Sequence, residues 1–453
     1  MATRKGASAK RMLTRRRFLQ WTAGSVATAA FITRRASAAG ADFDWKKYKG
    51  TTIRYLGWND LWSVNMRDKL PEFEELTGIK VDWEQFPQEQ ARQKAPTELT
   101  AKNEDLDLIY AAPDVDCVRY VKAGWLVSLD EFLSDPKMVP PDWDPKDFAP
   151  GLLGTGVILG KRAVIPQQAE LMTFMYNKEV FAQKGVKLPT ALDELEAVVA
   201  KVHTPPSVAG MVNRGTAQQV TTPWAAYLYN FGGDWLTKDR KPALTTPESI
   251  RSIEFFAKLN RLYGPPGMLS LNWPEAATTF AQGRAAIHAD SNARRSMNED
   301  PKQSKVVGKV GYGLFPHGPN GVNKPWIWTA GNAISSYSKK KGAAWYFILW
   351  SINKKNQLYT HLKGVTAGRS SVWKAPETAE VRTKYPDWVA TTLKTMEISD
   401  KGIAPPVVAV AEYRTRVGEV LVKAIQGMTG DPLKDETAKA EKDLAAILAR
   451  TES

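Results

Sequence analysis

The chain of 453 residues is poor in the residue types that build many catalytic and metal sites. Its single cysteine, Cys117, excludes an intramolecular disulfide and a metal cluster held by several cysteines. Four histidines occur, and none of them is at HxxxH or HExxH spacing. The early region also lacks the GxGxxG and GxxxxGK[ST] patterns of dinucleotide and P-loop sites. We therefore expect neither a cofactor nor a metal ion.

Acidic residues are absent from residues 1–38, which carry nine of the 62 lysines and arginines. The formal charge of the whole chain is +14, yet the other 53 basic residues exceed the 48 acidic ones by only five. A small excess spread over the rest of the chain does not make the basic patch that a nucleic-acid binder needs. We therefore expect no nucleic-acid partner.

The N-terminal segment has the three parts of an export signal: a basic start, an apolar middle and a small-x-small cleavage site. Residues 14–20 read TRRRFLQ, a mildly apolar run follows over 21–32, and Ala36-Ser37-Ala38 closes the segment. The run is too short to span a bilayer permanently. TRRRFLQ resembles the twin-arginine (Tat) pattern S/T-R-R-x-F-L-K, with Gln20 in place of the final lysine. We predict that residues 1–38 are a Tat signal peptide, engaged by the Tat translocase and then cleaved.

No cysteine lies near this cleavage site, so we expect no lipid anchor. An exported protein without an anchor stays with the cell only where an outer membrane retains it. The predicted location is therefore the periplasm.

Strand-like and helix-like segments alternate in the next part of the chain. Residues 51–58 and 79–83 alternate between apolar and polar side chains and residues 106–110 are mostly apolar, which predicts strands. Residues 64–77 and 88–102 are predicted helices, and Asp114 is placed to cap a further one. This order predicts an α/β fold with a mostly parallel sheet.

Several short motifs follow one another at characteristic spacings. Residues 160–166 read GKRAVIP, 176–181 read YNKEVF and 188–195 read LPTALDEL, followed by FGG at 231–233 and FAQGRAAI at 280–287. In order and spacing they resemble the extracellular solute-binding proteins of ABC importers, in the sugar-binding group that includes maltodextrin-binding proteins. The resemblance runs from about residue 50 to about residue 430.

This resemblance implies a periplasmic-binding-protein fold, with two α/β lobes of discontinuous connectivity that close on a ligand about a hinge. The implied N-terminal lobe comprises residues 39–166 plus 312–337, and the implied C-terminal lobe 167–311 plus 338–453. The implied function is capture of a sugar or sugar alcohol in the interlobe cleft and delivery to the transmembrane subunits of an ABC permease. We expect a monomer.

Sugars offer hydroxyl groups and apolar C–H faces, so their sites combine aromatic rings with polar side chains. Loops after strands and polar residues in apolar runs are the positions of interest, since ligands of open α/β sheets bind at the carboxyl ends of strands. For Asp114 and Glu170 the choice also rests on the family resemblance, which places ligand carboxylates there. The resemblance likewise implies ligand contacts at Asp290 and Asn292, and it places Arg369 in the end motif of the family. The predicted ligand-binding residues are Trp58, Asn59, Asp114, Gln168, Glu170, Arg214, Trp224, Trp235, Asp290, Asn292, Trp326, Trp328 and Arg369.

Two alternatives remain open at this stage. Basic residues near the candidate positions (Arg214, Arg294, Arg295 and Arg369) leave room for an anionic sugar, and the resemblance also allows a polyamine, a metal ion or another small solute as the ligand of the same fold. The pair Asp114 and Glu170 could in principle act as the two carboxylates of a glycosidase. Nothing else in the sequence supports catalysis, and we expect a binding protein rather than an enzyme.

Overall fold

A computed structural model describes residues 43–452. Its main feature is a seven-stranded sheet in the order β2-β1-β3-β9-β6-β7, with β8 also paired to β6. The strands are β1 (Thr52–Trp58), β2 (Lys80–Phe86), β3 (Leu108–Ala111), β6 (Ile165–Asn177), β7 (Ile287–Ser291), β8 (Val310–Gly313) and β9 (Ile327–Ile334). A separate hairpin joins β4 (Val157–Ile158) to β5 (Lys161–Arg162).

The three strands predicted early in the chain are confirmed as β1, β2 and β3. Both β2 and β3 pair with β1 in parallel, as expected for strands joined through helices. The prediction of a mostly parallel sheet is wrong beyond them, because β9 runs antiparallel to β3 and β6, and β7 and β8 run antiparallel to β6. The α/β class itself is confirmed.

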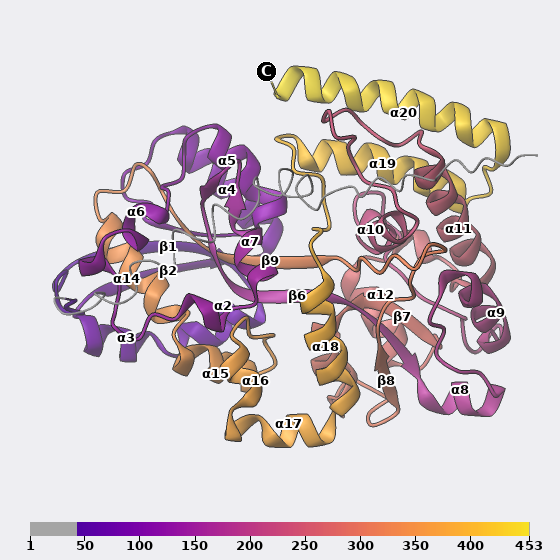
Figure 1. Ribbon diagram of the computed structural model, residues 1–453, viewed down its shortest axis with the longest axis horizontal. Helices are drawn as coiled ribbons and strands as arrows, with labels where there is room; N and C mark the ends of the chain where they lie inside the picture. The colour runs from indigo at the N-terminus through magenta and orange to yellow at the C-terminus, as the bar shows by residue number, and fades with distance from the viewer. Residues whose placement is uncertain (1–42, 453) are drawn as a thin grey trace, which may run out of the picture.

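Strands β6 and β9 connect the two halves of the sheet (Figure 1). The first half of β6 pairs with β9, from Ile165 opposite Asn332 to Leu171 opposite Ile327, and its second half pairs with β7 and β8. The register shifts between Pro166 and Gln168. A proline has no N–H to give to the ladder, so an irregularity at this point is expected.

Helices cover the sheet and fill both ends of the molecule. Beside the first strands lie α2 (Leu61–Arg67), α3 (Leu70–Thr77), α4 (Gln88–Thr100), α5 (Val118–Lys122), α6 (Asp130–Leu133), α14 (Lys341–Ser351) and α15 (Lys354–Leu362). The others are α7 (Pro150–Thr155), α8 (Lys178–Lys184), α9 (Leu192–Val202), α10 (Thr221–Asn230), α11 (Pro247–Tyr263), α12 (Trp273–Ala281), α13 (Arg295–Asn298), α16 (Ser370–Lys374), α17 (Ala379–Lys384), α18 (Pro386–Ile398), α19 (Val410–Ile425) and α20 (Gly430–Thr451).

The single helix predicted over residues 64–77 is wrong, because the structure has α2 and α3 there. Pro71 lies in the first turn of α3, and a proline cannot donate the backbone hydrogen bond that would continue α2. Helix α2 also begins earlier than predicted. Its cap is Asp60, whose carboxylate accepts the backbone N–H of Ser63 at 2.7 Å.

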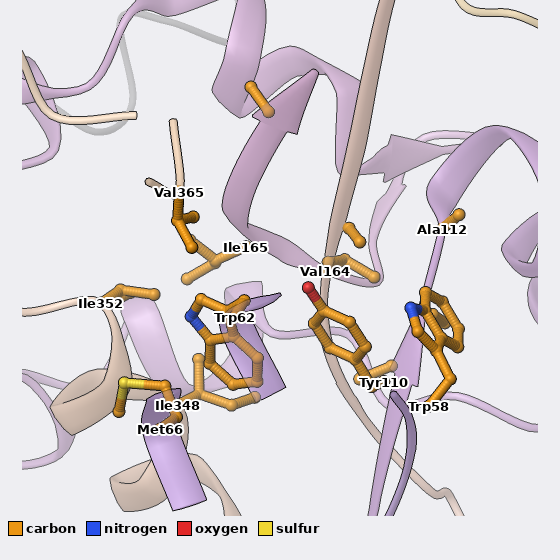
Figure 2. Packing of buried hydrophobic residues seen from close by; sticks show 14 of the residues in the cluster. Trp58, Trp62, Met66, Tyr110, Ala112, Val164, Ile165, Ile348, Ile352 and Val365 are labelled. Atoms are coloured by element: carbon orange, nitrogen blue, oxygen red, sulfur yellow. The ribbon is translucent and has the colours of Figure 1, made fainter. Parts of the chain in front are cut away.

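Buried apolar side chains form two clusters, one around β1–β3 and one around α9–α11, α19 and α20. In the first cluster Trp62 stacks on Tyr110 with ring centroids 4.9 Å apart (Figure 2). Helix α14 packs in this cluster, although the predicted boundaries assign residues 338–453 to the other lobe. The chain leaves β9 beside β3, so α14 starts next to the first strands. The lobe boundaries stay a prediction. Helix α14 packs with the cluster around β1–β3, although those boundaries place it in the C-terminal lobe.

Within residues 43–452, none of the helices combines the length and the apolar character needed to cross a membrane.

Candidate functional site

The candidate site is a cavity of about 530 Å³ where the two hydrophobic clusters meet. Trp58 of the first cluster and Trp326 of the second both line it, and Trp328 packs against both clusters. The other walls come from the N-terminal ends of α4 and α12, the middle of β6, the residues after β7 and the loop over 363–366. Segments far apart in the sequence therefore meet around one space.

Seven of the thirteen predicted residues line this cavity: Trp58, Asn59, Gln168, Glu170, Arg214, Trp326 and Trp328. Trp58 and Asn59 lie at the carboxyl end of β1, where a parallel strand presents its loop to a ligand. Glu170 is opposite Trp328 in the β6–β9 pairing, so the carboxylate and the indole are neighbours across the strands. Whether these residues bind a ligand stays a prediction.

On the side of the first cluster, the key polar group is the carboxylate of Asp60. One oxygen caps α2, and the other accepts the amide of Gln168 at 2.6 Å. Burial raises the pKa of Asp60 to about 6, against the opposing effect of these hydrogen bonds. Arg92 also lines the cavity, and its guanidinium lies 5.3 Å from the ring of Trp58 and pairs with Asp116 at 3.1 Å.

Four further charged residues form a continuous array, which we call the paired-charge wall: Glu170, Arg294, Asp290 and Arg214. Arg214 donates two hydrogen bonds to Asp290, at 2.7 and 2.8 Å. Arg294 donates to Glu170 at 3.2 Å, and its Nε lies 3.6 Å from Asp290. Burial opposes ionisation of Asp290, but the two arginines outweigh it and hold the pKa of that carboxyl well below its usual range.

Trp273 and Arg414 also line the cavity, although neither is among the residues predicted from the sequence. Trp273 is the first residue of α12 and follows the cap Asn272. The guanidinium of Arg294 stacks on the indole of Trp273, 4.4 Å from the ring centroid. Arg414 of α19 is only 4% exposed and donates to the hydroxyls of Thr221 and Thr222. The capping residue Asn272 could have indicated from the sequence that a helix begins at Trp273. No neighbouring residue in the sequence distinguishes Arg414 from the other charged residues of α19.

Three predicted residues lie close to the cavity but do not line it. Asp290 is held behind Arg214, and Asp114 accepts the backbone N–H of Ile403 at 3.0 Å. Asp114 therefore makes no cap to the short π-helix Pro113–Cys117, contrary to the prediction. Asn292 is fully buried, where it accepts the N–H of Leu171 and donates to Thr366. Each of these side chains makes at least one hydrogen bond to another segment of the protein.

Three further predicted residues belong to the hydrophobic interior. Trp224 and Trp235 pack edge to face, 5.2 Å apart, and their ring N–H groups bond Ser252 and Tyr229. Arg369 is 2% exposed and pairs with Asp147 at 3.2 Å. The structure does not bring these three side chains to the cavity. In each case a buried polar group has found a partner inside the fold, as burial requires.

No group of three or more histidine, cysteine, aspartate or glutamate side chains in the described part of the chain could hold a metal ion. The cavity is instead a mixture of indole rings with amide, carboxylate and guanidinium groups. Such a surface offers stacking faces together with both donors and acceptors of hydrogen bonds.

Comparison with known proteins gives consistent likenesses. A model of the bacterial extracellular solute-binding protein family matches residues 49–358. The erythritol/L-threitol-binding protein of Mycolicibacterium smegmatis is 26% identical over 338 residues, which cover 71% of this chain and 70% of that protein. The mannitol-binding protein of Pseudomonas aeruginosa is 24% identical over 308 residues, which cover 67% of this chain and 69% of that protein.

Solved structures show the same arrangement. A solute-binding protein of Agrobacterium radiobacter in complex with ribitol has a TM-score of 0.78 at 24% identity, covering 88% of this chain and 99% of that one. A maltose-bound MalE3 of T. maritima has a TM-score of 0.74 at 21% identity, covering 88% of this chain and all of that one. At these identities the likeness concerns the fold.

Proposed function

Because the chain belongs to the bacterial extracellular solute-binding protein family, we propose that it binds a sugar or sugar alcohol in the cavity and delivers it to the permease of an ABC importer. Its fold is of the periplasmic-binding-protein type, as the sequence resemblance implied.

The single observation that carries the choice of ligand is the composition of the cavity. Four tryptophans line it together with Asn59, Gln168 and several charged side chains. Indole rings stack on the C–H faces of a carbohydrate chain, while amides and charged groups hydrogen-bond its hydroxyls. Two relatives are named for erythritol, L-threitol and mannitol, which supports a polyol in particular.

Ligand capture is proposed to close the two predicted lobes about β6 and β9, the strands that connect the two halves of the sheet. Trp58 comes from the first cluster and Trp326 from the second, so a ligand touching both would favour the closed form. The permease would then recognise that form. Binding without turnover is expected, because the role is transfer rather than chemistry.

The route to the compartment is also a proposal. The basic pair Arg15-Arg16, the apolar stretch after it and the Ala-Ser-Ala site lie outside the described residues, and their support is the Tat-like sequence itself. A Tat substrate folds before export, and release by cleavage at about residue 38 would leave the protein in the periplasm.

A thermal-shift screen of the purified mature protein tests the proposal. The panel should hold tetritols, pentitols, hexitols, mono- and disaccharides, polyamines and amino acids. A bound ligand stabilises by RT ln(1 + [L]/Kd), about 2.7 kcal/mol at a hundredfold excess over Kd. We expect stabilisation by a polyol or sugar with the ligand recovered unchanged. Stabilisation by polyamines or amino acids alone would overturn the choice of ligand.

A further inference from the structure

The paired-charge wall (Glu170, Arg294, Asp290 and Arg214) contains two cations and two anions in direct contact. Arg214 is committed to Asp290 through both of its hydrogen bonds to the carboxylate. Arg294 is committed to Glu170 through Nη2 and also faces Asp290 through Nε. The fully buried His288 nearby is neutral, since burial lowers its pKa to about 4. The wall therefore carries no net charge at neutral pH.

The guanidinium of Arg294 is fixed in place rather than free to reach for a ligand. It stacks on the indole of Trp273 at 4.4 Å and is only 13% exposed. Glu170, which holds it, is 22% exposed and faces the cavity from β6. A ligand carboxylate approaching Arg294 would have to displace Glu170, or lie beside it and be repelled.

The other buried charges of the cavity also balance. Arg92 pairs with Asp116, and the two remaining groups, Asp60 and Arg414, are of opposite sign. Glu89 and Lys363, at the rim, are exposed to solvent, where water and salt screen their charges. Asp300 adds one further negative charge to the lining. A neutral polyhydroxylated chain can use these charged groups as strong hydrogen-bond partners, whereas a carboxylate finds no uncompensated positive wall.

We propose that Glu170 determines specificity by holding Arg294, so that the cavity accepts neutral polyols and rejects their carboxylated counterparts. This inference rests on the proposed function, because it concerns the choice among ligands of the same cavity. Glu170 can still hydrogen-bond a hydroxyl of the neutral ligand through the oxygen that Arg294 does not use. Its second role is to cancel a cation that would otherwise attract aldonates and uronates.

The test compares each alditol with the aldonate of the same carbon chain, using ribitol with D-ribonate and D-mannitol with D-mannonate. In each pair only one end differs, CH2OH against COO−. Calorimetric titration of the wild-type protein should give an alditol preference of roughly tenfold or more, the effect of one unfavourable charged contact. Equal or tighter binding of the aldonate by the wild type overturns the inference, and this measurement needs no variant.

The decisive variant is Glu170→Gln, which keeps the shape of the side chain and leaves Arg294 without its anion. We expect the aldonate-to-alditol affinity ratio to rise roughly ten- to a hundredfold. The double variant Glu170→Gln/Arg294→Gln should return the ratio towards its wild-type value. Glu131→Gln removes the same charge from an exposed position outside the cavity and should leave the ratio unchanged.

The outcomes separate the inference from the proposed function. Alditol binding with the same ratio in the wild type and in Glu170→Gln refutes the inference alone. An equal rise in Glu131→Gln also refutes it, because the effect would then be one of overall charge. If the wild type binds no polyol or sugar of the panel, the proposed function fails first and the inference falls with it. Melting curves of the unliganded variants confirm that each one is folded.

Discussion

Arg369 tests whether a residue predicted to contact the ligand has a structural role instead. The sequence predicted a ligand contact, but the side chain is buried and does not line the cavity. Its Nε donates to the carbonyl of Ile352 at 2.7 Å, and its Nη1 lies 3.2 Å from the carboxylate of Asp147. The guanidinium also stacks 4.2 Å from the ring of Phe148. Replacing Arg369 by methionine should therefore destabilise the protein and leave its affinity for the ligand unchanged.

The expected loss follows from what the substitution leaves behind. Methionine keeps the apolar packing of the arginine stem but removes the charge opposite the buried Asp147. Breaking a buried ion pair from one side costs about 3–5 kcal/mol. Asp147 retains two hydrogen bonds from Ser371, at 2.7 and 2.6 Å, so the lower end, about 3 kcal/mol, is expected.

The assay is urea unfolding followed by tryptophan fluorescence, together with calorimetric titration of the best ligand. If an uncompensated carboxylate causes the loss, adding Asp147→Asn should recover part of it. The double variant should then be about 1 kcal/mol more stable than the sum of the single losses predicts. A variant Arg369→Met with wild-type stability but no ligand binding would refute the reasoning and restore Arg369 as a ligand contact.

Three further predictions concern the cavity, pH and export. Trp328→Ala should weaken ligand binding roughly tenfold or more by calorimetry, whereas Trp125→Ala, also partly buried but outside the cavity, should not. Burial raises the pKa of Asp114 from 3.8 to about 6, so between these pH values the folded state holds more protons than the unfolded state. The wild type should therefore lose stability relative to Asp114→Asn as pH rises from 4 to 6 in urea titrations, and a gap independent of pH would contradict this. Lysine at both Arg15 and Arg16 should leave the full-length chain in the cytoplasm by fractionation, and normal export would contradict the Tat proposal.

Local patterns were enough to predict the first strands. Alternation over 51–58 and 79–83 reflects side chains that point to opposite faces of a sheet, a property of each strand alone. The direction of the central strands was not predictable in this way. Strand β9 begins at Ile327, 216 residues after β3 ends at Ala111, and nothing near either strand marks their antiparallel pairing.

The same contrast applies to the residues of the cavity. Trp58 and Asn59 were predictable as the end of a strand, and Glu170 as a charge within an apolar run. The six predicted residues that do not line the cavity are of the same chemical types. Asn292 and Arg369, for example, are polar groups whose partners come from other segments, such as Thr366 and Asp147. A list of residue types cannot distinguish a group that awaits a ligand from one already satisfied.

The sequence by itself determined the family, the α/β class and the chemistry to expect, because motif order and strand periodicity are properties of contiguous residues. The tertiary structure alone decided which side chains share the cavity and which charges cancel. Glu170 and Arg294 are 124 residues apart, yet their contact sets the charge of a whole wall. Electrostatic compensation depends on distance in space, and that distance exists only once the chain has folded.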